Sequence, residues 1–369
     1  MKPGRLTWID YAKGIAIILV LYRHVFEGIK ASGISIEQYI WLENANIMVF
    51  SFRMPLFFIV SGIFVAGSLQ KRGLAEFIGT KVRTILYPYF LWGILQITLQ
   101  LVFLKFINAH RTPSDYLYLL YQPREIEQFW YLYALFNVTV LYVLVKEKLG
   151  ITPVQNVVIG IIFLYASALF FQHHINLYFI QDILHFYLFF AVGDAISHLI
   201  KNKSNFRYFE SWITLGLLLV PFILSQTYFL HQSILYAKHQ GDIKYKYFEF
   251  DQPFRYLLIA FIGCAFIITL TFILQKYKVM TWLQVLGRHS LYIYVTHVIV
   301  FASLRVFMTK VLGIYNVPVL LLAGIIAGLI IPLLLYQLSV KLNVRWLFSL
   351  EKNAPAIKVV HRSNSQLAQ

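Results

Sequence analysis

Charged residues are scarce in this sequence, and cysteine is almost absent. Asp, Glu, Lys and Arg make up 13% of the 369 residues. A soluble domain carries about a quarter, so the composition argues against an ordinary soluble globular protein. The one cysteine, Cys264, stands alone in an apolar segment, which indicates a packed apolar side chain. The sequence also lacks an internal repeat, a glycine-rich nucleotide-binding loop and a metal-ligand motif, so we expect no metal site.

Hydrophobic residues dominate the chain, at 59% of all positions. Ten apolar segments approach the ~20 residues that a helix needs to cross a bilayer. They predict an all-α polytopic membrane protein with about ten transmembrane helices. The segments are 8–28, 47–69, 84–107, 128–145, 155–172, 178–200, 211–230, 256–275, 289–309 and 317–340.

The basic residues indicate the orientation of these helices. The connections on the side of the two chain ends hold 18 of the 32 Lys and Arg residues, and those on the opposite side hold nine. This bias predicts that both termini are cytoplasmic. The net charge of +16 then reflects the membrane topology and attraction to anionic lipids. We expect no nucleic-acid partner, because the basic residues are divided among short segments. We expect one transmembrane domain over 1–350 and a short cytoplasmic tail over 351–369.

The first apolar segment contains two ionisable residues, Lys13 and His24, eleven positions apart. Eleven steps of about 100° return a helix to within roughly 20° of the same face, and they advance it by ~16 Å. The two side chains therefore line one stripe, with the lysine near the cytoplasmic surface and the imidazole toward the outer leaflet. This spacing suits a long anionic ligand that is bound at one end and reacts at the other.

Three further stretches accompany this pair. They read Ser51-Phe-Arg-Met-Pro-Leu-Phe-Phe-Ile-Val-Ser-Gly62, Phe129-Trp-Tyr-Leu132 and Leu286-Gly-Arg-His-Ser-Leu-Tyr-Ile-Tyr-Val-Thr-His297. Together with the ten segments, they resemble the membrane acyltransferase-3 family, and most closely its single-domain branch that O-acetylates sugars of surface polysaccharides. The resemblance covers essentially the whole chain.

The resemblance implies transfer of an acyl group, usually acetyl, from cytoplasmic acyl-CoA to a hydroxyl of a surface-glycan or lipid-linked sugar at the outer face. Acetyl-CoA is then the donor, and the location is the bacterial inner membrane. The family's essential histidine corresponds to His24 and its basic residue to Lys13. Lysine replaces the commoner arginine there and offers a point charge without the bidentate fork. Arg53 stands where many members have histidine, so the family gives no role for that position.

We expect three residues to take part in the chemistry. His24 is suited to take a proton from a sugar hydroxyl, or to accept the acyl group itself. Glu27, three positions on, either hydrogen-bonds His24 or is an exposed carboxylate at the helix end. Arg53 lies roughly 9 Å into the second segment, near the level of His24. It either polarises the thioester carbonyl or pairs with Glu27 as a structural bridge.

Further residues are predicted to contact the donor. Asp10, three positions before Lys13, either orients the lysine or favours the helix start. Arg72, Lys81 and Arg83 flank the second cytoplasmic connection, 70–83. Their charge suits the phosphates of CoA, although it also suffices as a determinant of topology.

Four residues are predicted to contact the acceptor: Trp130, Asp182, His185 and Tyr247. Asp182 and His185 form a pair at i and i+3 that either lines the acceptor route or packs in the core. Tyr247 belongs to an aromatic stretch of the connection 231–255, which suits the apolar face of a sugar or an interfacial aromatic belt. The rival function is a transporter or flippase of a lipid-linked glycan. Such proteins often contain inverted repeats, and the sequence shows none.

Overall fold

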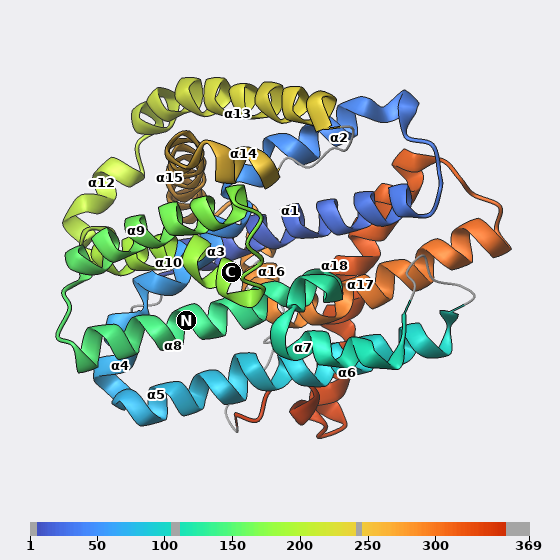
Figure 1. The fold of residues 1–369 in the computed structure, drawn as a ribbon, viewed down its shortest axis with the longest axis horizontal. Helices are drawn as coiled ribbons and strands as arrows, with labels where there is room; N and C mark the ends of the chain where they lie inside the picture. The colour runs from blue at the N-terminus through green and yellow to red at the C-terminus, as the bar shows by residue number, and fades with distance from the viewer. Residues whose placement is uncertain (1–5, 105–110, 241–245, 352–369) are drawn as a thin grey trace, which may run out of the picture.

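The computed structural model describes residues 6–104, 111–240 and 246–351, apart from the side chains of 237–240, 246 and 247. Within these residues the regular elements are all helical, and none is a strand. The longer helices are α1 (Trp8–Ala31), α3 (Phe50–Ile63), α6 (Tyr87–Val102), α8 (Trp130–Lys148), α9 (Pro153–Gln172), α10 (Phe179–Ala195), α13 (Trp212–Gln240), α15 (Pro253–Tyr277), α17 (Ser290–Val306) and α18 (Val317–Lys341) (Figure 1).

Shorter helices extend or connect the long ones. The α-helical ones are α2 (Ile40–Met48), α4 (Val65–Arg72), α5 (Leu74–Lys81), α7 (Tyr118–Tyr121), α11 (Ser197–Lys201), α12 (Phe206–Phe209), α14 (Lys246–Asp251) and α16 (Trp282–Arg288). The 3-10 and π turns are η1 (Glu37–Tyr39), η2 (Val82–Leu86), η4 (Pro113–Leu117), η5 (Pro123–Phe129), η6 (Lys203–Asn205), η7 (Phe307–Val311) and η8 (Arg345–Leu347).

Among the described residues, eight helical runs are long and apolar enough to cross a membrane. They correspond to eight of the ten predicted segments, and the other two segments are also helical. The first segment forms α1, which has 24 residues but contains five charged ones, and the sixth forms α10, which has 17 residues. The all-helical membrane architecture is thus confirmed, whereas ten crossings with cytoplasmic termini stay a prediction. The predicted tail lies outside the described residues beyond Glu351.

The predicted connection 70–83 is largely helical, because α4 and α5 occupy most of it. The turn between them is Gly73, whose φ of +71° and ψ of 166° suit a residue without a Cβ. α5 then continues through the π-helical turn η2 into α6. Pro88 follows that turn and has no N–H to donate, so the regular helical pattern is interrupted there.

Helix α1 lies inside the bundle and packs against α3, α15, α16, α17 and α18 (Figure 1). Its contact with α16 is very close. A Cβ added to Gly287 would lie 1.8 Å from the carbonyl oxygen of Asp10, and one added to Gly14 would lie 2.2 Å from that of Leu283. Small residues that let helix backbones approach are typical of membrane bundles. The helix that carries Lys13 is therefore held firmly from its first turns.

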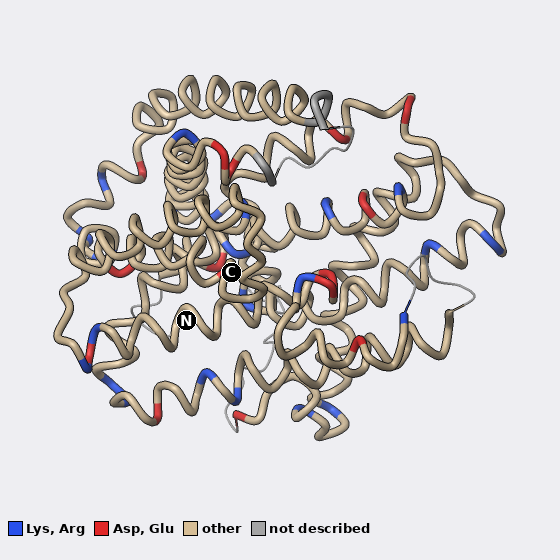
Figure 2. Tube along the Cα trace, in the orientation of Figure 1, with Lys and Arg blue, Asp and Glu red and all other residues tan. Residues whose placement is uncertain are grey.

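The periphery of the bundle is apolar. α13 packs against α15 and leaves Ile213 and Leu217 more than 70% exposed. Figure 2 shows most charged residues near helix ends and on connections, with long uncharged stretches between them. A surface of this kind is suited to lipid.

The beginning and the end of the described chain lie on the same side of the bundle. Lys81 in α5 is close enough to both Lys13 and Glu351 for their charges to interact. The backbone N–H of Leu350 donates to the carbonyl oxygen of Arg83 at 3.3 Å. This arrangement agrees with an even number of crossings.

Candidate active site

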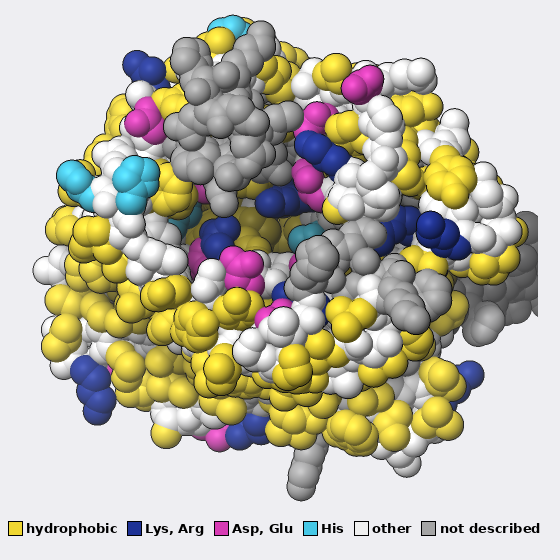
Figure 3. All heavy atoms as spheres, turned by 45° about the vertical axis from the view of Figure 1, so that its right-hand side comes forward, with side chains coloured by type: hydrophobic (Ala, Val, Ile, Leu, Met, Phe, Trp, Pro, Cys, Tyr) yellow, Lys and Arg dark blue, Asp and Glu magenta, His cyan; other side chains and the backbone are white. Residues whose placement is uncertain are grey.

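A cavity of about 1150 Å³ lies toward the other end of α1. The second half of α1 contributes to its wall, together with α3, η5, the connection from α9 to α10, α14 and α17. Figure 3 shows it as a hollow that contains basic, acidic and histidine side chains, with largely apolar surface below it. The cavity is therefore a polar space inside an apolar protein, as expected for a site that admits a hydrophilic substrate.

His24 lines this cavity, and its ring lies beside that of a second histidine, His297 of α17. The two ring centroids are 5.2 Å apart and the ring planes make an angle of 57°. Nδ1 of His297 lies 2.7 Å from the carbonyl oxygen of Tyr294 and 3.1 Å from that of Ile293, so this nitrogen carries the proton. The other nitrogen, Nε2, is then an acceptor. It is buried and has no hydrogen-bond partner among the described residues.

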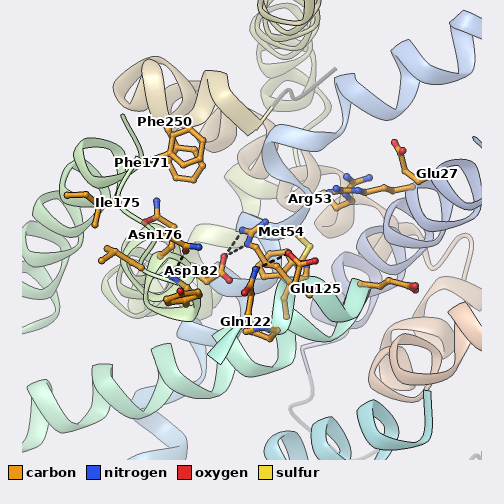
Figure 4. Close-up of a pocket in the computed structure, with 18 of the residues that line it drawn as sticks. Glu27, Arg53, Met54, Gln122, Glu125, Phe171, Ile175, Asn176, Asp182 and Phe250 are labelled. Carbon is orange, nitrogen blue, oxygen red and sulfur yellow. Dashed lines mark hydrogen bonds and ion pairs between the residues drawn. The ribbon is translucent and has the colours of Figure 1, made fainter. Parts of the chain in front are cut away.

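Arg53 and Glu27 occupy the same end of the cavity (Figure 4). The Arg53 side chain is 1% exposed, and its Nη1 donates to the carbonyl oxygen of Leu19 at 3.0 Å and to Oδ1 of Asn46 at 3.3 Å. Nδ2 of Asn46 donates to Oε1 of Glu27 at 3.1 Å. Asn46 therefore connects the arginine with the carboxylate. Arg53 is also close enough for its charge to act on the imidazole of His24.

A second polar group faces this one from α10 and η5. Oδ1 of Asp182 accepts from Nε and Nη2 of Arg124 at 2.8 and 2.5 Å. The Arg124 guanidinium also lies 4.3 Å from the ring centroid of Trp130. Figure 4 shows Asp182 across the cavity from Glu27 and Arg53. Two of the predicted acceptor residues, Trp130 and Asp182, thus line the same cavity as His24.

The other two predicted acceptor residues do not line the described wall of the cavity. His185 lies one turn deeper in α10 and is 1% exposed. Its Nε2 is 3.8 Å from Oε2 of Glu249. The side chain of Tyr247, in α14, is outside the described residues.

The predicted donor residues lie at the opposite end of α1. Lys81 interacts electrostatically with Lys13 and Arg72, so three of them form one basic group. The α1 helix is uninterrupted between Lys13 and His24. The structure therefore places the basic group and the imidazole at two levels of one helix.

The two remaining donor candidates form ion pairs. Arg83 Nη2 lies 2.5 Å from Oε1 of Glu76, at an exposed position. Oδ2 of Asp10, which is buried, accepts from Nε of Arg288 at 3.1 Å. The Asp10 pair joins α1 to the end of α16. Among the described residues, no group of three or more His, Cys, Asp or Glu side chains is placed to hold a metal ion.

A comparison of the sequence with known families decides which family this arrangement belongs to. The model of an acyltransferase domain, that of the acyltransferase-3 family, matches residues 6–337. The chain belongs to the acyltransferase-3 family. The matched part of the chain is therefore an acyltransferase domain, and its apolar helices indicate a multi-pass membrane protein. The resemblance noted in the sequence is confirmed.

Two named proteins resemble this acyltransferase-3 member over part of its length. Nodulation protein NolL of Mesorhizobium japonicum is 25% identical over 209 residues, which are 57% of this chain and 52% of NolL. Nodulation protein NolL of Sinorhizobium fredii is 27% identical over 127 residues, which are 34% of this chain and 32% of that protein. The chain thus spans about half the length of the first relative and a third of the second. No solved structure matches it.

The structure adds residues that sequence reasoning did not assign to the candidate site. His297 ends one of the quoted motifs, but its place beside His24 depends on how α17 packs on α1. Asn46 and Arg124 belong to no motif. The sequence could have suggested Arg124, because it is a basic residue a few positions before the stretch Phe129–Leu132.

Proposed function

We propose that this acyltransferase is an O-acetyltransferase of the bacterial inner membrane. It takes the acetyl group from cytoplasmic acetyl-CoA and transfers it to a hydroxyl of a surface-glycan or lipid-linked sugar at the outer face. The observation that carries the proposal is the arrangement of α1. Lys13 lies in a basic group at one level of this helix, and His24 lies in a polar cavity at another.

The chemistry follows from the groups around His24. The imidazole takes the proton of the acceptor hydroxyl while the oxygen attacks the thioester carbonyl carbon. The carbon–sulfur bond then breaks, and the proton passes to the sulfur, which leaves as the CoA thiol. The guanidinium of Arg53 stabilises the negative charge that develops on the carbonyl oxygen. Asn46 and Glu27 support Arg53 through the hydrogen bonds described above.

His297 acts as a positioning residue in this scheme. Its Nδ1–H is engaged by backbone carbonyls, so its Nε2 is able to accept only. A histidine that receives a hydrogen bond from its neighbour's ring N–H fixes which nitrogen of that neighbour is left as the base. This Nε2 has no partner in the described structure, and the two ring centroids are 5.2 Å apart. We infer that a small movement of the rings in the substrate complex lets His24 donate its N–H to His297 and present its lone pair to the acceptor hydroxyl.

The donor is bound at the other level of α1. Lys13, Arg72 and Lys81 supply positive charge for the phosphates of CoA. Asp10 and Arg83 act beside them through their ion pairs with Arg288 and Glu76. On the acceptor side, Trp130 and Asp182 line the cavity, with His185 behind them and Tyr247 in the adjoining helix α14.

The test is acetyl transfer by the purified protein. The protein is reconstituted in vesicles and supplied with radiolabelled acetyl-CoA and a glycan extract from the producing cells. Label that enters the glycan and is released by mild alkali supports an O-acetyltransferase. Movement of glycan across the vesicle without label in it would favour the rival transporter.

The orientation is tested separately with single cysteines in a Cys264→Ala background. Lys203→Cys lies on the side of the chain ends and Ser114→Cys on the side of the cavity; both positions are exposed. An impermeant thiol reagent is expected to label Ser114→Cys from outside the cell and Lys203→Cys only after the membrane is opened. The reverse pattern would contradict donor entry from the cytoplasm.

A further inference from the structure

Two oxygen atoms in the first turn of α10 are buried without a hydrogen-bond partner among the described residues. They are Oδ2 of Asp182 and Oε1 of Gln181. The Gln181 amide is oriented by its Nε2, which donates to the carbonyl oxygen of Ser167 at 2.8 Å and to its Oγ at 3.0 Å. Both residues line the cavity, and Asp182 is 1% exposed. A buried polar atom without a partner is unusual enough to need an explanation.

Both atoms are hydrogen-bond acceptors and neither is a donor. A ligand group that satisfies them must therefore be a hydrogen-bond donor. The nearest guanidinium, that of Arg124, already donates twice to the other oxygen of Asp182 and covers the Trp130 ring. The charge of this arginine is thus largely compensated.

The other charges on the described cavity wall also disfavour a negatively charged acceptor. Besides Asp182 the wall contains four carboxylates, and it contains two guanidiniums in addition to that of Arg124. The carboxylates are those of Glu27, Glu125, Glu127 and Asp251, and the guanidiniums are those of Arg23 and Arg53. An acceptor with a carboxylate of its own would meet like charge here, which costs binding energy.

We propose that the α10 end of the cavity is the subsite for the acceptor sugar, and that it selects a neutral, hydroxyl-bearing ring over a uronate. The inference rests on the function proposed above. A sugar hydroxyl donates to Oδ2 of Asp182 and a second one to Oε1 of Gln181. The exocyclic carboxylate of a uronate has no hydrogen to donate and repels Asp182.

The experiment compares matched acceptors that differ in one group. The full-length protein is purified in a detergent without sugar, because a glycoside detergent would compete. Acetyl transfer from radiolabelled acetyl-CoA is measured to the p-nitrophenyl glycosides of glucose, galactose and mannose and to those of the corresponding uronic acids. We expect kcat/KM for the preferred neutral glycoside to exceed that of its uronate about 10- to 100-fold, the range of a hydrogen bond to a charged group.

Asp182→Asn removes the charge and keeps the shape of the side chain. It is expected to lower kcat/KM for the neutral glycoside through KM and to reduce the neutral-to-uronate ratio about tenfold. The matched control is Asp194→Asn on the same helix. Asp194 is also buried, but it pairs with Lys146 and Tyr142 at 2.6 and 2.7 Å and does not line the described cavity. This control leaves the ratio unchanged, and the ratio does not depend on how much protein is folded.

The possible outcomes separate the two proposals. Equal transfer to glucoside and glucuronide, or a ratio that Asp182→Asn does not change, overturns the acceptor subsite and leaves the acetyltransferase in place. Transfer to none of the six glycosides, by protein that binds acetyl-CoA, contradicts a sugar acceptor altogether.

Discussion

The two levels of α1 are built in different ways. At the level of Lys13 the basic group combines one residue of α1 with two residues of α4 and α5, and all three side chains are half-buried or exposed. At the level of His24 the polar groups are mostly buried, and each is held by a partner from a distant part of the chain: Arg53 by Leu19, His24 beside His297, and Asp182 by Arg124.

The Lys13 level is therefore suited to bind a ligand by charge, and the His24 level is suited to bind one by specific hydrogen bonds. A cluster of cations attracts phosphates over several ångströms and tolerates small displacements. A buried hydrogen-bonding group requires an exact partner, because leaving it unsatisfied costs about 1–3 kcal/mol. We therefore expect substitutions to have large effects at the His24 level and graded effects at the Lys13 level.

The largest effect is expected for His24→Ala. Loss of a general acid–base group reduces rates by about 10²–10⁴-fold. Affinity for acetyl-CoA, measured by titration calorimetry, should change little, because the site proposed for the donor's phosphates is at the other level. His198→Ala, an exposed histidine of α11, is the control and should retain full transfer. Near-normal acetylation by His24→Ala at equal expression would remove His24 from the chemistry.

His297→Phe is expected to have the next largest effect. Phenylalanine keeps a buried ring beside His24 but offers no acceptor, so kcat should fall roughly tenfold or more while KM for acetyl-CoA is kept. His297→Gln retains an acceptor oxygen and should recover part of the lost rate.

His289 provides the matched control for His297. It is also buried, and its Nδ1 lies 2.8 Å from the carbonyl oxygen of Val285 in the same manner. It packs against Tyr292 and Tyr336 about two helical turns before His297, whereas the ring beside His24 is that of His297. If His289→Phe lowers kcat as much as His297→Phe does, the effect is one of helix packing, and His297 has no positioning role.

His24 and His297 also show how much of the site could be predicted from the sequence. The stripe that joins Lys13 to His24 was predictable, because helical periodicity is local and needs only the spacing. The pairing of His24 with His297 was not, since it depends on the packing of α17 against α1 across more than 270 positions. The same reason explains why Asn46 and Arg124 were missed. The helices of the connection 70–83 were not predicted, because its charged residues suggested a loop, whereas α4 and α5 continue almost to Gly73.

A smaller effect is expected for Lys13→Ala. Removing one cation of the basic group should weaken acetyl-CoA binding about tenfold, the loss of a hydrogen bond to a charged group. Lys13→Arg keeps the charge and should bind as well as the parent or better, since arginine adds a bidentate fork. Titration with acetyl-CoA measures both variants. Unchanged binding by Lys13→Ala would mean that this lysine serves topology or structure only.

The smallest effect is expected for Arg83→Gln. Arg83 lies close to Lys81 in sequence, but its guanidinium is paired with Glu76 at 2.5 Å, and both side chains are more than a third exposed. Exposed pairs contribute little to stability, and a guanidinium already bound to a carboxylate has little charge left for a phosphate. Acetyl-CoA affinity should therefore fall less than about threefold. Lys81→Gln changes a residue that interacts with Lys13 and should weaken binding more. If Arg83→Gln is the more damaging of the two, the donor's phosphates lie beyond Lys81 toward Glu76, and Lys13 is not at their centre.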